Sequence, residues 1–170
     1  SLYGYLKTRM GTRFRQVFED DAFLPSINNA KWRTYGACLS DLAIFVAATS
    51  GAENRLANAE IEALARHCFD KAIEQTFNDA DAEQVRPGSV ASFQQRIAQV
   101  HWANAAIREN AFTVSPEELI ASAPIADHLK QEDRDIVTNS IRFRWRDIRE
   151  QLRKRLDADA ICQDWRDRQG

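Results

Sequence analysis

The sequence predicts an all-α protein, and three observations lead to that prediction. Glycine and proline are scarce, with 6 and 4 residues among 170, whereas residues that favour helix are abundant. Apolar residues recur at helical spacing along most of the chain. No run of alternating apolar and polar residues indicates a strand. We therefore expect a single-domain bundle over residues 1–170, with five long or medium helices and short helices near 116–129 and 158–168.

The first two helices are predicted over residues 2–18 and 26–50. An apolar stripe marks the first helix, which we expect to end at the acidic residues that follow Phe18. The second helix begins after Ser26, a good N-cap residue, and it is apolar almost all the way round. Such a helix is typical of the centre of a bundle or of one side of a subunit interface.

The third and fourth helices are predicted over residues 58–77 and 89–110. Between them, residues 78–88 are polar and acidic and end in Pro-Gly, which indicates a loop. The fourth helix carries a second face of small residues around Trp102, opposite its main apolar stripe.

The segment Ser-Pro-Glu-Glu at 115–118 is the strongest local signal for a helix start. The serine is placed as N-cap, the proline stands in the first turn, and the second glutamate closes a capping box. This helix is expected to be short, because Pro124 interrupts it. The last long helix is predicted over residues 132–156, followed by a short helix that runs through Trp165.

Composition and charge argue against several classes of protein. The formal net charge is −2, so bulk charge does not indicate a polyanionic partner. Cys38, Cys68 and Cys162 lie far apart without a CxxC motif, which is typical of reduced thiols and favours the cytoplasm. The first residues lack the apolar region of a signal peptide, and the longest apolar run, residues 42–48, is too short to cross a bilayer. The chain begins with Ser1, which is compatible with a fragment of a longer protein.

No constellation of residues predicts catalysis or metal binding. No histidine follows a glutamate at the spacing of a ferritin-like di-metal site, and the adjacent His67 and Cys68 diverge on a helix. P-loop, GxGxxG, GxSxG and HExxH motifs are all missing from the sequence. We therefore predict no metal or other cofactor and name no catalytic residue.

The leading hypothesis is a non-enzymatic, intracellular helical module that binds a protein partner or self-associates as a homodimer. Its basis is the number of helices with more than one apolar face. The second and fourth predicted helices would supply the interface, and Trp32, Ile44 and Trp102 are the interface candidates.

The alternative is a ligand-binding or enzymatic bundle with a polar-lined internal pocket for a small molecule. Its candidate residues are Asp41, Asn104, His101 and Tyr35. Asp41 stands inside the apolar second helix, where it is either an acid/base or ligand group, or a flanking residue that reaches solvent or an arginine. Asn104 has two similar interpretations, since a buried amide either specifies helix register or orients a polar ligand.

A third hypothesis is a basic surface for nucleic acid or an anionic membrane. Residues 142–155 are rich in arginine, and the first 18 residues carry four bases and no acid. Acids alternate with the arginines, however, and the acidic region 53–83 is a possible set of partners. Nucleic acid and membrane are therefore less favoured than a protein partner.

Overall fold

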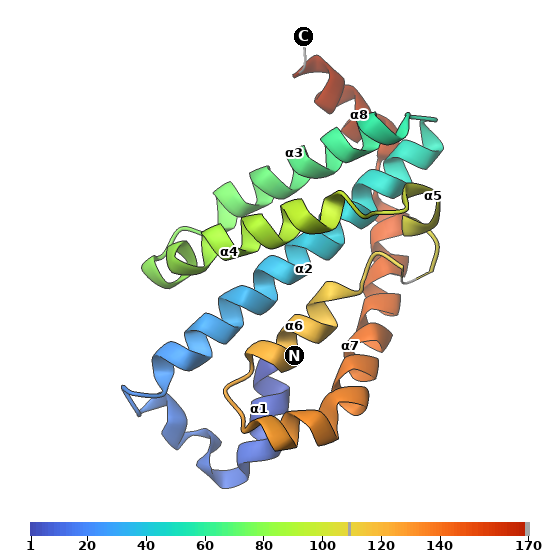
Figure 1. Cartoon of the computed structure of the whole chain (residues 1–170). Helices are drawn as coiled ribbons and strands as arrows, with labels where there is room; N and C mark the ends of the chain where they lie inside the picture. The colour runs from blue at the N-terminus through green and yellow to red at the C-terminus, as the bar shows by residue number, and fades with distance from the viewer. Residues whose placement is uncertain (109, 169–170) are drawn as a thin grey trace.

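The computed structural model describes residues 1–108 and 110–168 (Figure 1). These residues form eight α-helices and no strand, so the all-α prediction is confirmed. The helices are α1 (Leu2–Met10), α2 (Leu24–Glu53), α3 (Asn58–Thr76), α4 (Ala80–Ile97), α5 (Trp102–Ala105), α6 (Val114–Ser122), α7 (Asp127–Arg155) and α8 (Ala158–Asp167).

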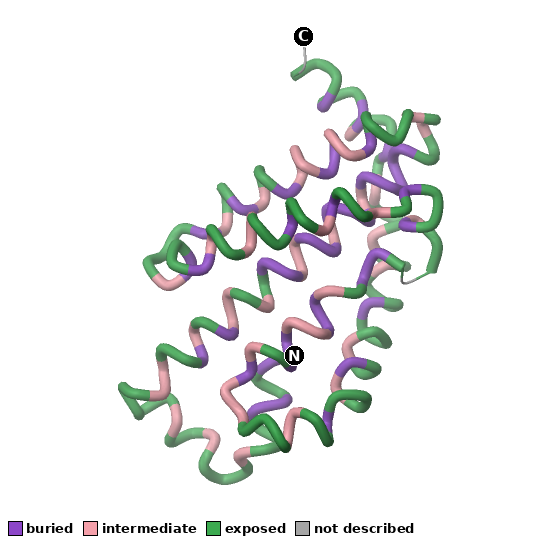
Figure 2. Tube along the Cα trace, viewed as in Figure 1, coloured by how far each residue is buried: buried purple, intermediate pink, exposed green. Residues whose placement is uncertain are grey.

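Helix α2 is the axis of the bundle. Helices α3 and α4 pack on one side of it and α6 on the other, while α5 and α8 lie near its C-terminal end (Figure 1). Between Ala43 and Gly51 buried residues stand on all sides of the helix (Figure 2). This packing explains why the helix is apolar all the way round.

By length and composition alone, α2 could also cross a membrane. Its most apolar stretch is hydrophobic enough for this, although the longest uninterrupted apolar run is short. Within the protein, 72% of that stretch is buried. Core helices of proteins that do not enter membranes show the same combination, and the helices packed around α2 account for its apolarity.

The buried side chains form two clusters, and both include residues of α2. The larger cluster lies among α2, α3, α4, α5 and α8, and it includes Phe69 stacked on Phe93 with ring centroids 3.9 Å apart. The smaller cluster joins α1 and α6 to the first half of α2. Ile141 of α7 packs against both clusters and so connects them.

The first predicted helix is shorter than expected. Helix α1 ends at Met10, and residues 11–18 continue as the 3₁₀ helices η1 (Gly11–Phe14) and η2 (Gln16–Phe18). Gly11 has a φ of 55°, a conformation that glycine reaches without steric strain and that stops the α-helix.

The predicted loop over residues 78–88 is wrong, because most of it is the first half of α4. The carboxylate of Asp79 accepts a hydrogen bond from the Ala82 amide at 2.8 Å and caps the helix. The acidic residues that suggested a loop lie in the first turn, where the helix dipole favours negative charge. Pro87 lies inside the helix, and the burial of Ala82 and Val85 stabilises this segment.

The fourth helix is predicted to extend to residue 110, well beyond the end of the helix in the structure. Helix α4 stops at Ile97, and within the described residues 98–108 only Trp102–Ala105 is α-helical. The last long helix starts earlier than predicted, at Asp127. By contrast, the short helices near 116–129 and 158–168 are present as α6 and α8, and Asp157 caps α8 through the Ala160 amide.

Candidate functional site

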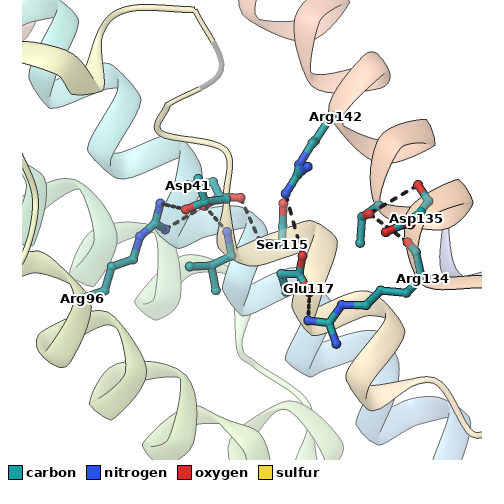
Figure 3. Close-up of polar contacts among 10 residues, drawn as sticks. Asp41, Arg96, Ser115, Glu117, Arg134, Asp135 and Arg142 are labelled. Atoms are coloured by element: carbon teal, nitrogen blue, oxygen red, sulfur yellow. Dashed lines mark hydrogen bonds and ion pairs between the residues drawn. The ribbon is translucent and has the colours of Figure 1, made fainter. Parts of the chain in front are cut away.

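Asp41 is the centre of a buried polar cluster where α2, α4 and α6 meet. Its side chain is 0% exposed and forms an ion pair with Arg96 at 2.7 Å. It also accepts hydrogen bonds from the amides of Val114 at 3.3 Å and Ser115 at 3.0 Å. Figure 3 shows Asp41 between Arg96 and the first turn of α6. A carboxylate of one helix therefore caps the N-terminus of another.

Arg96 connects this cluster to the segment before α6. Its guanidinium donates hydrogen bonds to the hydroxyl of Ser40 at 2.8 Å and to the carbonyl oxygen of Ala111 at 2.5 Å. A longer contact of 3.4 Å reaches Thr113. The planar group with several donors suits this role, since a lysine could not serve the same acceptors in one geometry.

The electrostatics of Asp41 follow from burial and from its partners. Burial raises the pKa of the Asp41 carboxyl above its ordinary value, and Arg96 with the two amides opposes that rise. Both carboxylate oxygens are already engaged. These contacts give Asp41 a part in holding the helices together.

Ser115 is not the N-cap that the sequence suggested. Helix α6 begins at Val114, two residues before the predicted first residue Pro116, and Thr113 at the cap position makes no capping hydrogen bond with its side chain. Because Asp41 accepts from the first amides, the Ser115 hydroxyl is available to another partner. It accepts a hydrogen bond from the indole N–H of Trp145 at 2.8 Å, which joins α6 to α7.

A groove of about 810 Å³ begins at this hydrogen bond and opens to solvent. Residues of α1, α2, α6 and α7 line it, together with Thr76 at the end of α3. We call it the α2/α7 groove. Its walls are mainly aromatic and aliphatic, through Tyr3, Trp32, Tyr35, Ile141, Trp145 and Ile148.

Ring contacts hold the walls of the α2/α7 groove in place. The rings of Trp32 and Tyr35 are perpendicular, with centroids 5.7 Å apart, and Phe77 lies 5.2 Å from Trp32. On the opposite wall, Trp145 stacks on Phe112 at 4.5 Å. Aromatic pairs at these separations are favourable beyond their burial, so the walls are preformed.

The charged side chains that line the α2/α7 groove are both cations. They are Lys31 of α2 and Arg144 of α7, and no carboxylate of the described residues lines the groove. The Lys31 ammonium lies 4.4 Å from the centre of the Trp32 ring, which is a cation–π contact. Among the described residues neither Lys31 nor Arg144 makes an ion pair.

Cys38 also borders the groove, next to Asp41. Burial raises the pKa of the Cys38 thiol to about 11, and the nearby carboxylate adds to the rise. The thiol is therefore protonated at neutral pH and is a poor nucleophile.

The four predicted pocket residues do not meet at one place. Tyr35 lies in the wall of the α2/α7 groove, and Asp41 reaches the groove through Ser115. His101 and Asn104 are exposed at α5, near the other end of α2 (Figure 1). The apolar face that seemed to surround Asn104 does not form, because α4 ends before it.

Two of the three predicted interface residues are core residues, which corrects that prediction. Ile44 is 1% exposed and Trp102 is 7% exposed, because neighbouring helices of the same chain cover them. Trp32 is half-buried and forms part of the groove wall.

The arginines of α7 have different partners from those predicted. Arg134 and Arg142 approach Glu117 of α6 at 2.5 Å and 3.8 Å (Figure 3). Arg153 donates a hydrogen bond to the carbonyl oxygen of Ala106. None of the ion pairs found in the described residues joins α7 to the acidic region 53–83.

A second cavity, of about 360 Å³, lies on the other side of the Asp41 cluster, among α2, α4 and α6. Its lining is more polar and includes Arg33, Arg96 and Glu118. Arg33 and Glu118 pair with each other at 2.7 Å, and Arg96 pairs with Asp41. The charges of this cavity are thus satisfied within the protein.

In the part of the chain that the structure describes, no three His, Cys, Asp or Glu side chains gather as a metal site. Comparisons with protein-family models, curated proteins and solved structures find no match. The fold and the groove thus define a class, an all-α bundle with a preformed apolar groove, and function has to be argued from the groove itself.

Sequence reasoning missed the α7 side of the groove. The apolar stripe that predicts the last long helix includes Trp145 and Ile148, but such a stripe does not specify which of its residues other helices cover. Arg144 is one of many arginines in its segment, and nothing in the local pattern distinguishes it.

Proposed function

We propose that this protein binds a small, largely apolar ligand in the α2/α7 groove without catalysing a reaction. The groove itself is the observation that supports the proposal. Its volume of about 810 Å³ lies within the range of ligand sites, roughly 300 to 1,000 Å³. Three free thiols suit a reducing compartment, so the proposal places the protein in the cytoplasm.

The exposure of the groove walls supports a ligand over simple packing. Tyr3, Tyr35 and Ile148 line the groove, and each remains exposed to solvent. Leaving such apolar surface in water is unfavourable by about 25 cal/mol per Å². A ligand that covers these side chains gains this free energy without any rearrangement of the helices.

The neutral fluorescent probe N-phenyl-1-naphthylamine tests the proposal. We expect its fluorescence to rise on binding to the protein, because the groove removes the probe from water. Ile148→Glu introduces a carboxylate into an exposed part of the apolar wall and should weaken probe binding by roughly tenfold.

Ile107→Glu is the matched control, because Ile107 is exposed and does not line the groove. This variant should bind the probe like the parent chain. Equal binding by all three proteins, or no binding by the parent, would contradict the proposal.

A second candidate function is association with a protein partner or a second copy through α7. Ile136 and Phe143 are 74% and 56% exposed, and their spacing of seven residues places them on one face. Sedimentation of the parent and of Ile136→Asp at micromolar concentration tests self-association. A dimer that the substitution dissociates supports it, whereas a monomeric parent removes it.

A further inference from the structure

We infer that the ligand of the α2/α7 groove is an amphipathic acid, with an apolar body between the aromatic walls and an anionic group at Arg144. This inference rests on the proposed function and adds the chemical class of the ligand. Lys31 contributes positive potential from the facing helix.

The first argument is the balance of charge in the groove. Lys31 and Arg144 line it, and within residues 1–108 and 110–168 no carboxylate lines it to neutralise their charges. The other cavities differ: the one beside Arg96 contains Glu118, and a third, at the N-terminal end of α2, contains Asp81. A cationic rim on an apolar groove complements a ligand with one anionic end.

The second argument is that Arg144 is available while its neighbours on α7 are engaged. Arg142 is near Glu117 at 3.8 Å, and Arg146 lies over the ring of Phe143 at 4.4 Å. Arg144 lines the groove and makes no ion pair in the described part of the chain. Its guanidinium can offer two parallel N–H donors to a carboxylate.

The third argument concerns Lys31. The cation–π contact with Trp32 keeps its ammonium against the groove wall, at 4.4 Å from the ring centre. The positive charge therefore stays at the edge of the apolar surface and is not dispersed into solvent. Arg144 and Lys31 belong to α7 and α2, so the two sides of the groove each contribute one cation.

The test compares decanoate with decanol, which have the same apolar chain but differ in charge. Each competes with N-phenyl-1-naphthylamine at low ionic strength. We expect decanoate to bind the parent about fivefold more tightly than decanol, and Arg144→Gln to abolish the difference. Raising the salt concentration should weaken decanoate alone, because the cations are near solvent.

Two further variants separate the effect of the Arg144 charge on binding from an effect of the substitution on folding. Arg144→Lys retains the charge and should keep part of the preference for decanoate, while Arg146→Gln removes a neighbouring charge outside the groove and should keep all of it. Unchanged decanol binding by Arg144→Gln shows that this variant is folded.

The outcomes separate the inference from the proposed function. If decanol and decanoate bind equally and Arg144→Gln changes neither, the inference is wrong and the proposed function stands. If neither competes for the groove, the proposed function fails. Arg144-dependent sedimentation with phosphatidylglycerol vesicles, without binding of free decanoate, would overturn the inference in favour of a membrane surface.

Discussion

At the scale of single residues, the buried carboxylate of Asp41 decides how three helices meet. Polar groups in an apolar helix are tolerated when every acceptor has a donor. Asp41 meets this condition with a guanidinium from α4 and two amides of α6. The same contact releases Ser115 to bind Trp145, so the polar cluster and the groove wall depend on each other.

Asp41→Ala should therefore destabilise the protein strongly. The substitution leaves Arg96 mostly buried without its partner and removes the cap of α6, and breaking a buried pair costs roughly 3 to 5 kcal/mol. Urea unfolding followed by circular dichroism measures the loss. Glu74→Gln breaks an exposed pair with Lys71 and should unfold at the urea concentration of the parent. Equal midpoints for both variants would mean that the Asp41 cluster contributes little.

Asp133 predicts a dependence of stability on pH. It accepts hydrogen bonds from Tyr5 at 2.9 Å and from Arg9, which holds α1 to α7. Chiefly through Arg9, these contacts lower the pKa of the Asp133 carboxyl. Because the folded state then binds the proton less readily than the unfolded state, this contribution is present above about pH 4. It is lost as the pH falls through the lowered pKa of the folded state.

Asp133→Asn should accordingly flatten the loss of stability below about pH 4, as measured by urea unfolding at several pH values. Asp70→Asn removes an exposed carboxyl that makes no ion pair in the described residues, and it should keep the steep loss of the parent. If the free energy of unfolding of the parent does not fall below about pH 4, the assignment of this pH dependence to Asp133 is contradicted.

At the scale of elements, close approach of α2 and α4 sets the position of Arg96 against Asp41. A Cβ atom at Gly36 would lie 2.4 Å from the Ser89 hydroxyl oxygen and 2.9 Å from its Cβ. These distances are too short for ordinary contact, so the crossing requires glycine on α2.

Gly36→Ala should thus destabilise the protein, although alanine favours helix. Overpacking costs about 1 to 3 kcal/mol, and the gain in helix propensity offsets up to about 1 kcal/mol of it. Gly88→Ala is the matched control within α4, because nothing lies within 4 Å of a Cβ there. Thermal unfolding should show a lower midpoint for Gly36→Ala and a raised one for Gly88→Ala; a raised midpoint for both would contradict the close crossing.

The helices that could be predicted from the sequence are those with local signals. Residues 58–77 carry a clear apolar stripe, and the structure forms α3 over nearly the same residues. The loop prediction at 78–88 failed because acidic residues also suit the first turn of a helix, and because α4 continues through Pro87 in its interior. Tertiary packing, which is not visible locally, decided between the two.

At the scale of the whole molecule, the central position of α2 was predictable and the groove was not. All-round apolarity indicated a central helix, and the bundle is built around α2. The groove combines residues of α1, α2, α6 and α7 that are up to about 147 positions apart, from Ser1 to Ile148. Arg96, the partner of Asp41, lies 55 positions further along the chain, so local sequence patterns could not predict this pair either.

The four tryptophans divide between the groove and the rest of the protein. Trp32 and Trp145 line the α2/α7 groove, whereas Trp102 and Trp165 are buried in the larger cluster and do not line it. Each indole N–H gives its own signal in a ¹H–¹⁵N correlation spectrum, so the four signals report on the two locations separately.

Titration of the ¹⁵N-labelled protein with decanol is the most direct measurement of ligand binding in the groove. The account predicts that the indole signals of Trp32 and Trp145 move progressively and reach saturation, while those of Trp102 and Trp165 stay in place. Shifts confined to Trp102 and Trp165, or no saturable shift at any of the four, would contradict it.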